Sequence, residues 1–327
     1  MVRTPCIIAR PGDTDGESQL CTRGAKSATF ADSMQGLSPE RLSSALDEAT
    51  LGRPASLYAW LERGSRLPSA RANDALADGF AQLCRARGKV ADTVALALAR
   101  LTPDEAPGAS AREFLPVCGI AALGARGAAD PQVRADFVKE LHAHADDLRF
   151  RVRDAVIQAL GRVGAAAGDS LVAEAASWMD GYFHAAAVVS ALGREPWLSA
   201  LHQAQGVIAR LDDAFVLARE APRSAARYPG RKALVEALGR APGAIAVRLG
   251  VPVFDMFVGW AGVSDPELRG LIEGVARDKR LASRFGPDLA RVRAALDASR
   301  PPVRNPDHNV GPTRDRSGER RRRGVRS

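Results

Sequence analysis

Three arginine residues follow copies of one short motif, and their chemistry suits binding. Ala-Leu-Gly occurs four times, and an arginine follows directly in three of the copies: Arg162, Arg194 and Arg240. A guanidinium group presents several N–H donors in one plane, which matches carboxylate and phosphate groups. The spacing predicts a basic stripe for an acidic peptide, a phosphate or a nucleic acid. The structural alternative is that cations in the last turn of a helix interact favourably with the helix dipole.

A second polar residue lies four positions before each of these arginines: Gln158, Ser190 and Glu236. Residues four apart share one face of a helix. If the three segments are helices in one register, the six side chains form rows on a common outer face. We expect these six residues to contact a partner.

The histidines do not predict a metal site. His142 and His144 are two residues apart, which is about 200° around a helix, so they do not share a ligand face. His142 and Asp146 are one helical turn apart, but the sequence supplies no further ligands beside them. We expect no metal ion and no cofactor.

Motifs for nucleotide binding and nucleophilic catalysis are also missing. Residues 23–27, Arg-Gly-Ala-Lys-Ser, lack the adjacent Gly-Lys of a P-loop and the glycine five positions earlier. The nucleophile motif Gly-x-Ser-x-Gly does not occur. The acidic doublets Asp146/Asp147 and Asp212/Asp213 are expected to be solvated helix ends. The sequence predicts a protein that is not an enzyme.

The elements that must position the arginines are helices. Alanine makes up about a fifth of the chain and aromatic residues 5%, a composition that favours helices over a β-sandwich or barrel. From Ser38-Pro39 onward, apolar residues recur at helical spacing, and Gly88 is expected to end a helix. Asp130-Pro131 and Asp265-Pro266 predict two helix starts.

The Ala-Leu-Gly copies form a degenerate repeat of helix pairs. Small residues one turn apart allow helices to approach closely, and the glycine is expected to end each helix. Residues 147–164 resemble the second helix of a HEAT repeat, with Asp147, Val152-Arg153, spaced alanines and Ala159-Leu160-Gly161. The copies at 184–193 and 231–240 keep less of the pattern. The resemblance implies an all-α, right-handed α-solenoid whose second helices line a concave side, with Asp147 and Arg153 in a polar ladder.

Two enzyme groups resemble this architecture. HEAT-type hydroxylases carry His-Glu pairs, and this chain has no His-Glu dipeptide. HEAT-like DNA glycosylases use a basic concave face with aromatic and acidic residues, but none of their motifs matches here residue by residue. A nucleic-acid-binding protein, including a base-repair glycosylase, is the alternative function.

The basic charge lies mainly at the C-terminal end. The formal net charge is +8 and the pI is near 9.8, yet residues 300–327 alone contain nine arginines against three acidic residues. Composition predicts that this tail and the leader at 1–36 are disordered. The tail has no aromatic residue, so it would bind nucleic acid only through phosphates. The net charge says little about the helical part.

Asp255 stands in an apolar stretch, Phe254-Asp255-Met256-Phe257, where an unpaired carboxylate is costly. We expect it to cap a helix or to pair with a base such as Arg248. The alternative is that Phe254, Phe257 and Trp260 open a partner groove. A second aromatic group is expected in the core: Trp178, Tyr182 and Phe183.

Cysteine usage and hydropathy complete the expectation. Four scattered cysteines predict neither a disulfide framework nor a zinc ribbon. The longest apolar run, 249–263, is shorter than the ~20 residues of a membrane span. We predict a cytoplasmic protein with a leader at 1–36, a HEAT-like α-solenoid at 37–299 and a tail at 300–327. Its predicted role is a non-catalytic scaffold that presents a concave helical surface to a protein partner.

Overall fold

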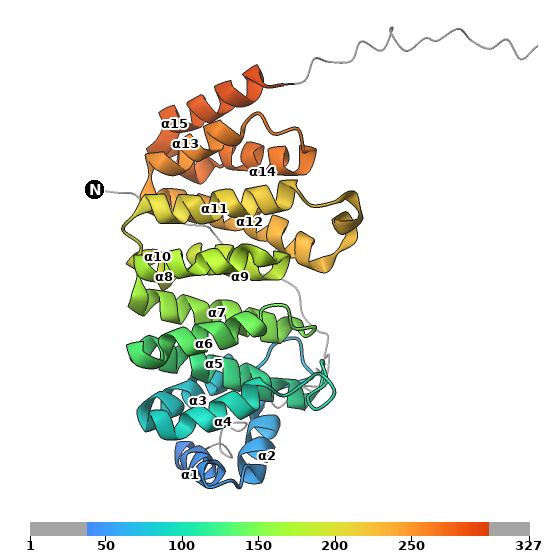
Figure 1. Cartoon of the computed structure of the whole chain (residues 1–327), viewed down its shortest axis with the longest axis vertical. Helices are drawn as coiled ribbons and strands as arrows, with labels where there is room; N and C mark the ends of the chain where they lie inside the picture. The colour runs from blue at the N-terminus through green and yellow to red at the C-terminus, as the bar shows by residue number, and fades with distance from the viewer. Residues whose placement is uncertain (1–37, 301–327) are drawn as a thin grey trace, which may run out of the picture. The chain divides into compact units, whose positions relative to one another are not determined.

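The chain is helical wherever its structure is described. The computed structural model describes residues 38–300, so the predicted leader and all of the predicted tail except Arg300 lie outside the described residues. Every regular element in this range is a helix (Figure 1). The α-helices are α1 (Pro39–Thr50), α2 (Ala55–Gly64), α3 (Asp74–Arg87), α4 (Lys89–Ala99), α5 (Phe114–Ala129), α6 (Pro131–Ala143), α7 (Phe150–Ala167), α8 (Asp169–Glu174), α9 (Tyr182–Leu192), α10 (Trp197–Ala200), α11 (Ala204–Arg219), α12 (Pro229–Leu249), α13 (Val251–Trp260), α14 (Pro266–Ala276) and α15 (Lys279–Ala298). Three short 3-10 helices are η1 (Ala111–Glu113), η2 (Ala175–Asp180) and η3 (Arg223–Arg227).

The predicted helix starts and the predicted stop at Gly88 are confirmed. Helix α1 begins at Pro39. The Asp130 carboxylate accepts a hydrogen bond from the Gln132 N–H at the start of α6, and Asp265 does the same for Glu267 at the start of α14. Gly88, with φ of 64°, ends α3 and precedes α4. These ends follow from side-chain oxygens that cap free N–H groups and from a glycine that adopts positive φ.

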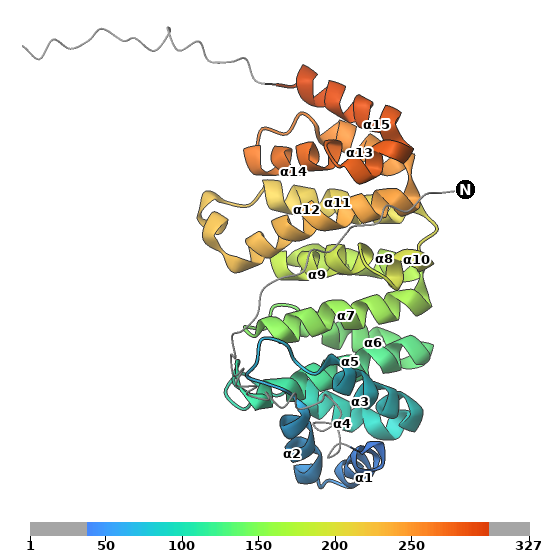
Figure 2. The same cartoon turned by 180° about the vertical axis from the view of Figure 1, so that it is seen from behind.

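Two rows of helices can be traced through the contacts between elements. In the first row α3 packs on α5, α5 on α7, α7 on α9, α9 on α12 and α12 on α14. In the second set, α4 and α6 pack on α5, η2 and α11 pack on α9, and α13 and α15 pack on each other. Figures 1 and 2 show the helices from opposite sides. The row α3–α5–α7–α9–α12–α14, called the first row below, carries the candidate site.

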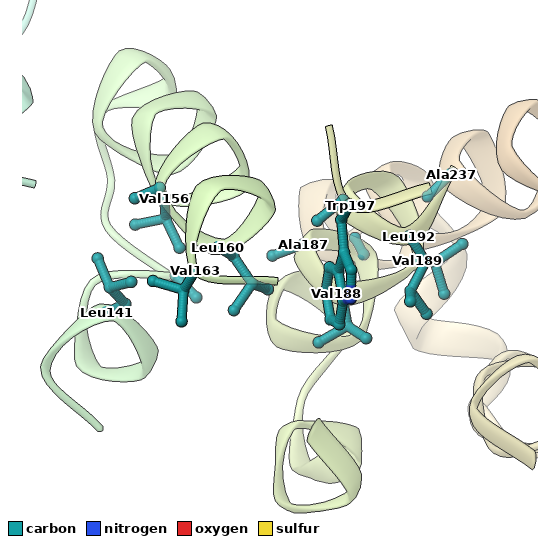
Figure 3. Packing of buried hydrophobic residues seen from close by; sticks show 14 of the residues in the cluster. Leu141, Val156, Leu160, Val163, Ala187, Val188, Val189, Leu192, Trp197 and Ala237 are labelled. Carbon is teal, nitrogen blue, oxygen red and sulfur yellow. The ribbon is translucent and has the colours of Figure 1, made fainter. Parts of the chain in front are cut away.

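The core between the rows is built from aliphatic side chains, phenylalanines and two buried tryptophans. Figure 3 shows Leu160 and Val163 of α7 directed into the space between α6 and α9, and both are fully buried. Trp197 is also fully buried, and its indole N–H donates to the Gly168 carbonyl over 3.2 Å. A Cβ at Gly164 would lie 2.1 Å from the Trp197 ring, so this position needs glycine. Trp178 lies in the core, as predicted.

The expectation that each Ala-Leu-Gly ends a helix is wrong for three of the four copies. Gly124, Gly161 and Gly239 lie inside α5, α7 and α12, and only Gly193 ends a helix. In two copies the glycine permits close approach: a Cβ at Gly124 would lie 2.6 Å from the Ala159 Cβ, and one at Gly193 would lie 2.5 Å from the Ala241 Cβ. Glycine ends a helix only where the chain turns out of it, and α5, α7 and α12 instead continue beyond their glycine.

Gly124→Ala and Gly161→Ala form a matched pair that tests this role. A Cβ at Gly161 would meet no atom within 4 Å, so this change should stabilise the protein by about 0.5–1 kcal/mol through helix propensity. At Gly124 the same change should cost about 1–3 kcal/mol, because α5 and α7 must separate. Urea unfolding followed by circular dichroism measures both. Equal effects of the two substitutions would contradict the close-contact role.

A buried arginine ties the loop after α4 to the start of α7. Arg149 donates hydrogen bonds to the carbonyl oxygens of Leu101 and Ala106 over 2.8 and 2.9 Å, and it pairs with the Asp147 carboxylate at 2.6 Å. The expected ladder between Asp147 and Arg153 is corrected in one respect. Arg153 donates to the backbone carbonyl of Asp147, whereas the carboxylate binds Arg149. Arg149 reaches the Asp147 carboxylate because the backbone turns at these residues into the start of α7.

Asp147 predicts a pH dependence of folding. Burial raises the pKa of this carboxyl group, but hydrogen bonds from Arg149 outweigh burial and leave the pKa below its usual 3.8. A lowered pKa in the folded state adds stability above the unfolded value, and this stability is lost as pH falls through the folded value. Asp147→Asn should therefore cost about 1.5–3 kcal/mol at about pH 6 and much less at about pH 3. Denaturant unfolding at both pH values checks this, and an unchanged difference would contradict it.

Several expectations about the acidic and aromatic residues are corrected. Asp255 neither caps a helix nor pairs with Arg248: it lies within α13 and forms an ion pair with Arg291 at 2.6 Å, because α15 packs beside it. The alternative groove at Phe254, Phe257 and Trp260 is also wrong. The two phenylalanines are buried in the core, while Trp260 is partly buried and donates to Asp212 over 2.7 Å.

Three of the four residues in the acidic doublets are not solvated helix ends, whereas Asp146 is exposed just after α6, as expected. Asp212 and Asp213 lie inside α11, and Asp213 pairs with Arg210 at 2.7 Å. Asp147 has a side chain only 8% exposed.

Near the other end of the described chain, Arg269 of α14 donates to the Ala261 carbonyl over 2.9 Å and also to the Leu296 carbonyl. Among the described helices, none combines the length and the apolar character that crossing a membrane requires.

Candidate partner-binding groove

All six residues predicted to contact a partner lie on three neighbouring helices of the first row or just beyond them. Gln158 and Arg162 belong to α7. Ser190 belongs to α9, and Arg194 follows two residues after that helix ends. Glu236 and Arg240 belong to α12. Because α7 packs on α9 and α9 on α12, residues from three distant parts of the sequence come together along one row.

These residues line three adjoining depressions that share walls. The first, of about 190 Å³, includes Gln158 and Arg162. The second, of about 210 Å³, includes Ser190, Arg194, Glu236 and Arg240. The third, of about 200 Å³, shares Gln158 and Arg162 with the first and Arg194 with the second. We call the three together the polar groove.

Alanines form much of the lining of the polar groove. Ala155 and Ala159 of α7 line its first part, together with Ala77 of α3 and Ala121 of α5. Another group of alanines lines its second part: Ala186, Ala187, Ala233, Ala237 and Ala241. A methyl group fills little space, so a ligand lying here would come close to the helix backbones.

The predicted arginines are paired with carboxylates. Arg162 pairs with Asp78 of α3, Arg194 lies 3.9 Å from Asp154 of α7, and Arg240 pairs with Glu236 one turn earlier at 2.6 Å. Across the whole lining there are six arginines and five acidic residues: Arg71, Arg151, Arg153, Arg162, Arg194 and Arg240 against Asp74, Asp78, Asp154, Glu195 and Glu236. The polar groove carries both charges in nearly equal numbers.

Two further arginines are held more firmly at its walls. Arg151 pairs with the buried Glu113 at 2.9 Å. The Arg153 guanidinium lies over the Phe183 ring, 4.4 Å from its centre. Burial lowers the pKa of Arg153, against the opposing effect of the Asp147 charge. Phe183 was predicted to lie in the core, but it lines the polar groove, where the Arg153 guanidinium covers one face of its ring.

The helix-dipole explanation does not hold for Arg162 and Arg240. Helix α7 continues to Ala167, so Arg162 is not in its last turn. Helix α12 continues to Leu249, so Arg240 lies in its interior. Arg194 directly follows Gly193, the C-cap of α9, so it lies at the negative end of that helix dipole. The dipole effect is confined to helix ends, which leaves pairing with acidic residues as the local role of Arg162 and Arg240.

The Ala-Leu-Gly repeat does not mark the part of the polar groove that comes from α3 and the loop before it. Arg71, Asp74 and Asp78 carry no repeat signal, and Asp78 meets Arg162 across 84 residues of chain. Nor does the repeat mark a cluster of His142, Asp180 and His184, whose ligand atoms all lie within 4.8 Å of one another. The four-residue spacing of Asp180 and His184 was a usable signal, because such residues meet on one helix face.

Comparisons with known proteins place the chain in no family. No protein-family description, no curated protein and no solved structure matches it.

Substitutions at the rim should leave folding intact. The Arg240 and Glu236 side chains are 73% and 57% exposed, and exposed ion pairs contribute little because water screens them. We expect Arg240→Ala to change the free energy of unfolding by less than about 0.5 kcal/mol. Urea unfolding of the full chain checks this. A loss above about 1 kcal/mol would instead assign this pair a structural role.

Proposed function

We propose that this chain is a HEAT-like α-solenoid that binds an extended protein segment in the polar groove, as a non-catalytic scaffold. The observation that carries the proposal is the continuity of the groove across α3, α7, α9 and α12. Helices that pack mainly on their neighbours form elongated surfaces suited to extended ligands. The alanine-rich lining leaves room for a polypeptide backbone, and the charged rim selects its side chains.

The balance of charge favours a protein over a nucleic acid. A nucleic-acid site neutralises phosphates with unpaired cations, and its affinity depends on them. In the polar groove each predicted arginine already has a carboxylate partner. A polypeptide with acidic and basic side chains can exchange partners with both members of such pairs, so we assign the polar groove to a segment of mixed charge.

The lining also lacks the nucleophile and base pairs of serine and cysteine catalysis. Among the residues that line the polar groove there is no histidine, cysteine or lysine, and Ser190 has no histidine beside it in that set. A serine nucleophile needs a general base within hydrogen-bond reach. This composition supports the binding role in preference to hydrolysis by a serine or cysteine nucleophile.

Selection of peptides followed by charge reversal tests the proposal. Peptides selected from a random display library on the full chain should carry charges of both signs. Arg194→Glu with Arg240→Glu should weaken a selected peptide about tenfold or more, because two favourable charge contacts become repulsive. Fluorescence anisotropy with the labelled peptide measures this. The matched control is Lys139→Glu, an exposed reversal on α6, which should leave the affinity unchanged.

Equal affinity of the peptide for the reversed variant and the wild type would contradict the groove assignment. The nucleic-acid alternative is tested in parallel with labelled duplex DNA over a salt series. DNA binding that disappears when Arg162, Arg194 and Arg240 become alanine would replace the protein ligand with a nucleic acid. Binding lost only when residues 320–323 become glutamine would assign it to the tail. Release of free base from alkylated DNA would show a glycosylase.

A further inference from the structure

Two histidines and one aspartate meet outside the polar groove lining, where α6, η2 and α9 come together. His142 lies in the last turn of α6, Asp180 is the last residue of η2, and His184 lies in the first turn of α9. The His142 Nε2 lies 3.1 Å from Asp180 Oδ2, and the His184 Nδ1 lies 2.9 Å from Asp180 Oδ1. One ligand atom from each residue lies within 4.8 Å of the other two.

The donors and their spacing match a transition metal ion. Two imidazole nitrogens and a carboxylate oxygen form a ligand set that Zn²⁺ and similar ions accept, whereas Ca²⁺ and Mg²⁺ prefer oxygen alone. Ligand atoms about 2.0–2.1 Å from a tetrahedral Zn²⁺ lie roughly 3.3 Å apart. Measured to the same Asp180 oxygen, Oδ1, the His142 Nε2 lies at 3.2 Å and the His184 Nδ1 at 2.9 Å, both already close to this value.

Trp178 and Gly181 flank the two stacked imidazole rings. The rings stack at 4.0 Å between centres and 12° between planes, and the buried Trp178 meets the His142 ring edge-on at 5.1 Å. A Cβ at Gly181 would lie 2.6 Å from the His184 Nδ1, so only glycine leaves this nitrogen open. This atom is buried, and within the described part of the chain it forms no well-aligned hydrogen bond despite the nearby carboxylate.

We propose that His142, Asp180 and His184 bind one Zn²⁺ or a similar divalent transition metal ion. The lone pairs of stacked rings run nearly parallel, so one imidazole turns about its Cβ–Cγ bond when the ion binds. Asp180 is 52% exposed, which gives the ion a path from solvent and leaves a coordination position for water. The bound ion links α6 to α9 and fixes the first turn of α9, which carries Phe183 of the polar groove.

Metal titration of the full chain, after treatment with a chelator, tests the site. Calorimetry with Zn²⁺ should show one ion bound per chain, and Co²⁺ in its place should give visible absorption bands. Loss of a second-shell partner costs 10–100-fold in metal affinity, so His142→Gln and Asp180→Asn, which remove ligands, should each cost about 100-fold or more. Zn²⁺ should raise the melting temperature of the wild type and leave that of the variants unchanged.

His202→Gln is the matched control, because His202 is exposed and lies after α10, outside this cluster. It should bind Zn²⁺ like the wild type. Circular dichroism confirms folding of each variant, and Asp180→Asn, at a half-exposed position, carries the test if a histidine variant unfolds. Uptake of one ion with unchanged affinity by all the cluster variants would overturn the proposal. A wild type that takes up no ion in large molar excess would overturn it as well.

Discussion

Close approach of helices at small residues is the constraint on which the first row depends. Gly124 against Ala159 and Gly193 against Ala241 leave no room for another methyl group, so α5, α7, α9 and α12 pack with their backbones near one another. The alanines that permit this packing also line the polar groove, where large side chains would fill the space that a ligand needs. The same residues thus set the distance between helices and the depth of the groove.

Local signals in the sequence predicted the helical class and several helix ends. Asp130 and Asp265 act as caps through their own backbone neighbours, and Gly88 turns the chain by its positive φ. The Ala-Leu-Gly copies misled because a glycine inside a helix and a glycine at its end look alike in sequence. What distinguishes Gly124 from Gly193 is whether its own helix continues: α5 runs on to Ala129, whereas α9 ends at Leu192.

The candidate groove was predictable only where the repeat marked it. Gln158, Arg162, Ser190, Arg194, Glu236 and Arg240 share a register, and the structure places them along one row. Their partners are not in that register: Asp78 reaches Arg162 from α3, and Asp154 reaches Arg194 from α7. The cluster of His142, Asp180 and His184 also depends on a long-range contact, since His142 meets Asp180 across 38 residues. Pairing between elements far apart in the chain cannot be read from a single sequence.

Arginine in this chain often acts as an internal brace. Arg149 binds backbone carbonyls of the loop after α4, and Arg269 binds carbonyls from two separate segments. Arg126 is buried against Asp92 at 2.7 Å. A lysine has a single ammonium group and does not span such sets of acceptors in one plane. Exchange of these arginines for lysine, in evolution or by engineering, would therefore keep the isoelectric point nearly constant. It would nevertheless remove hydrogen bonds that join separate segments in the interior. The arginine content of the chain therefore reflects contacts within the fold as well as any attraction of acidic ligands.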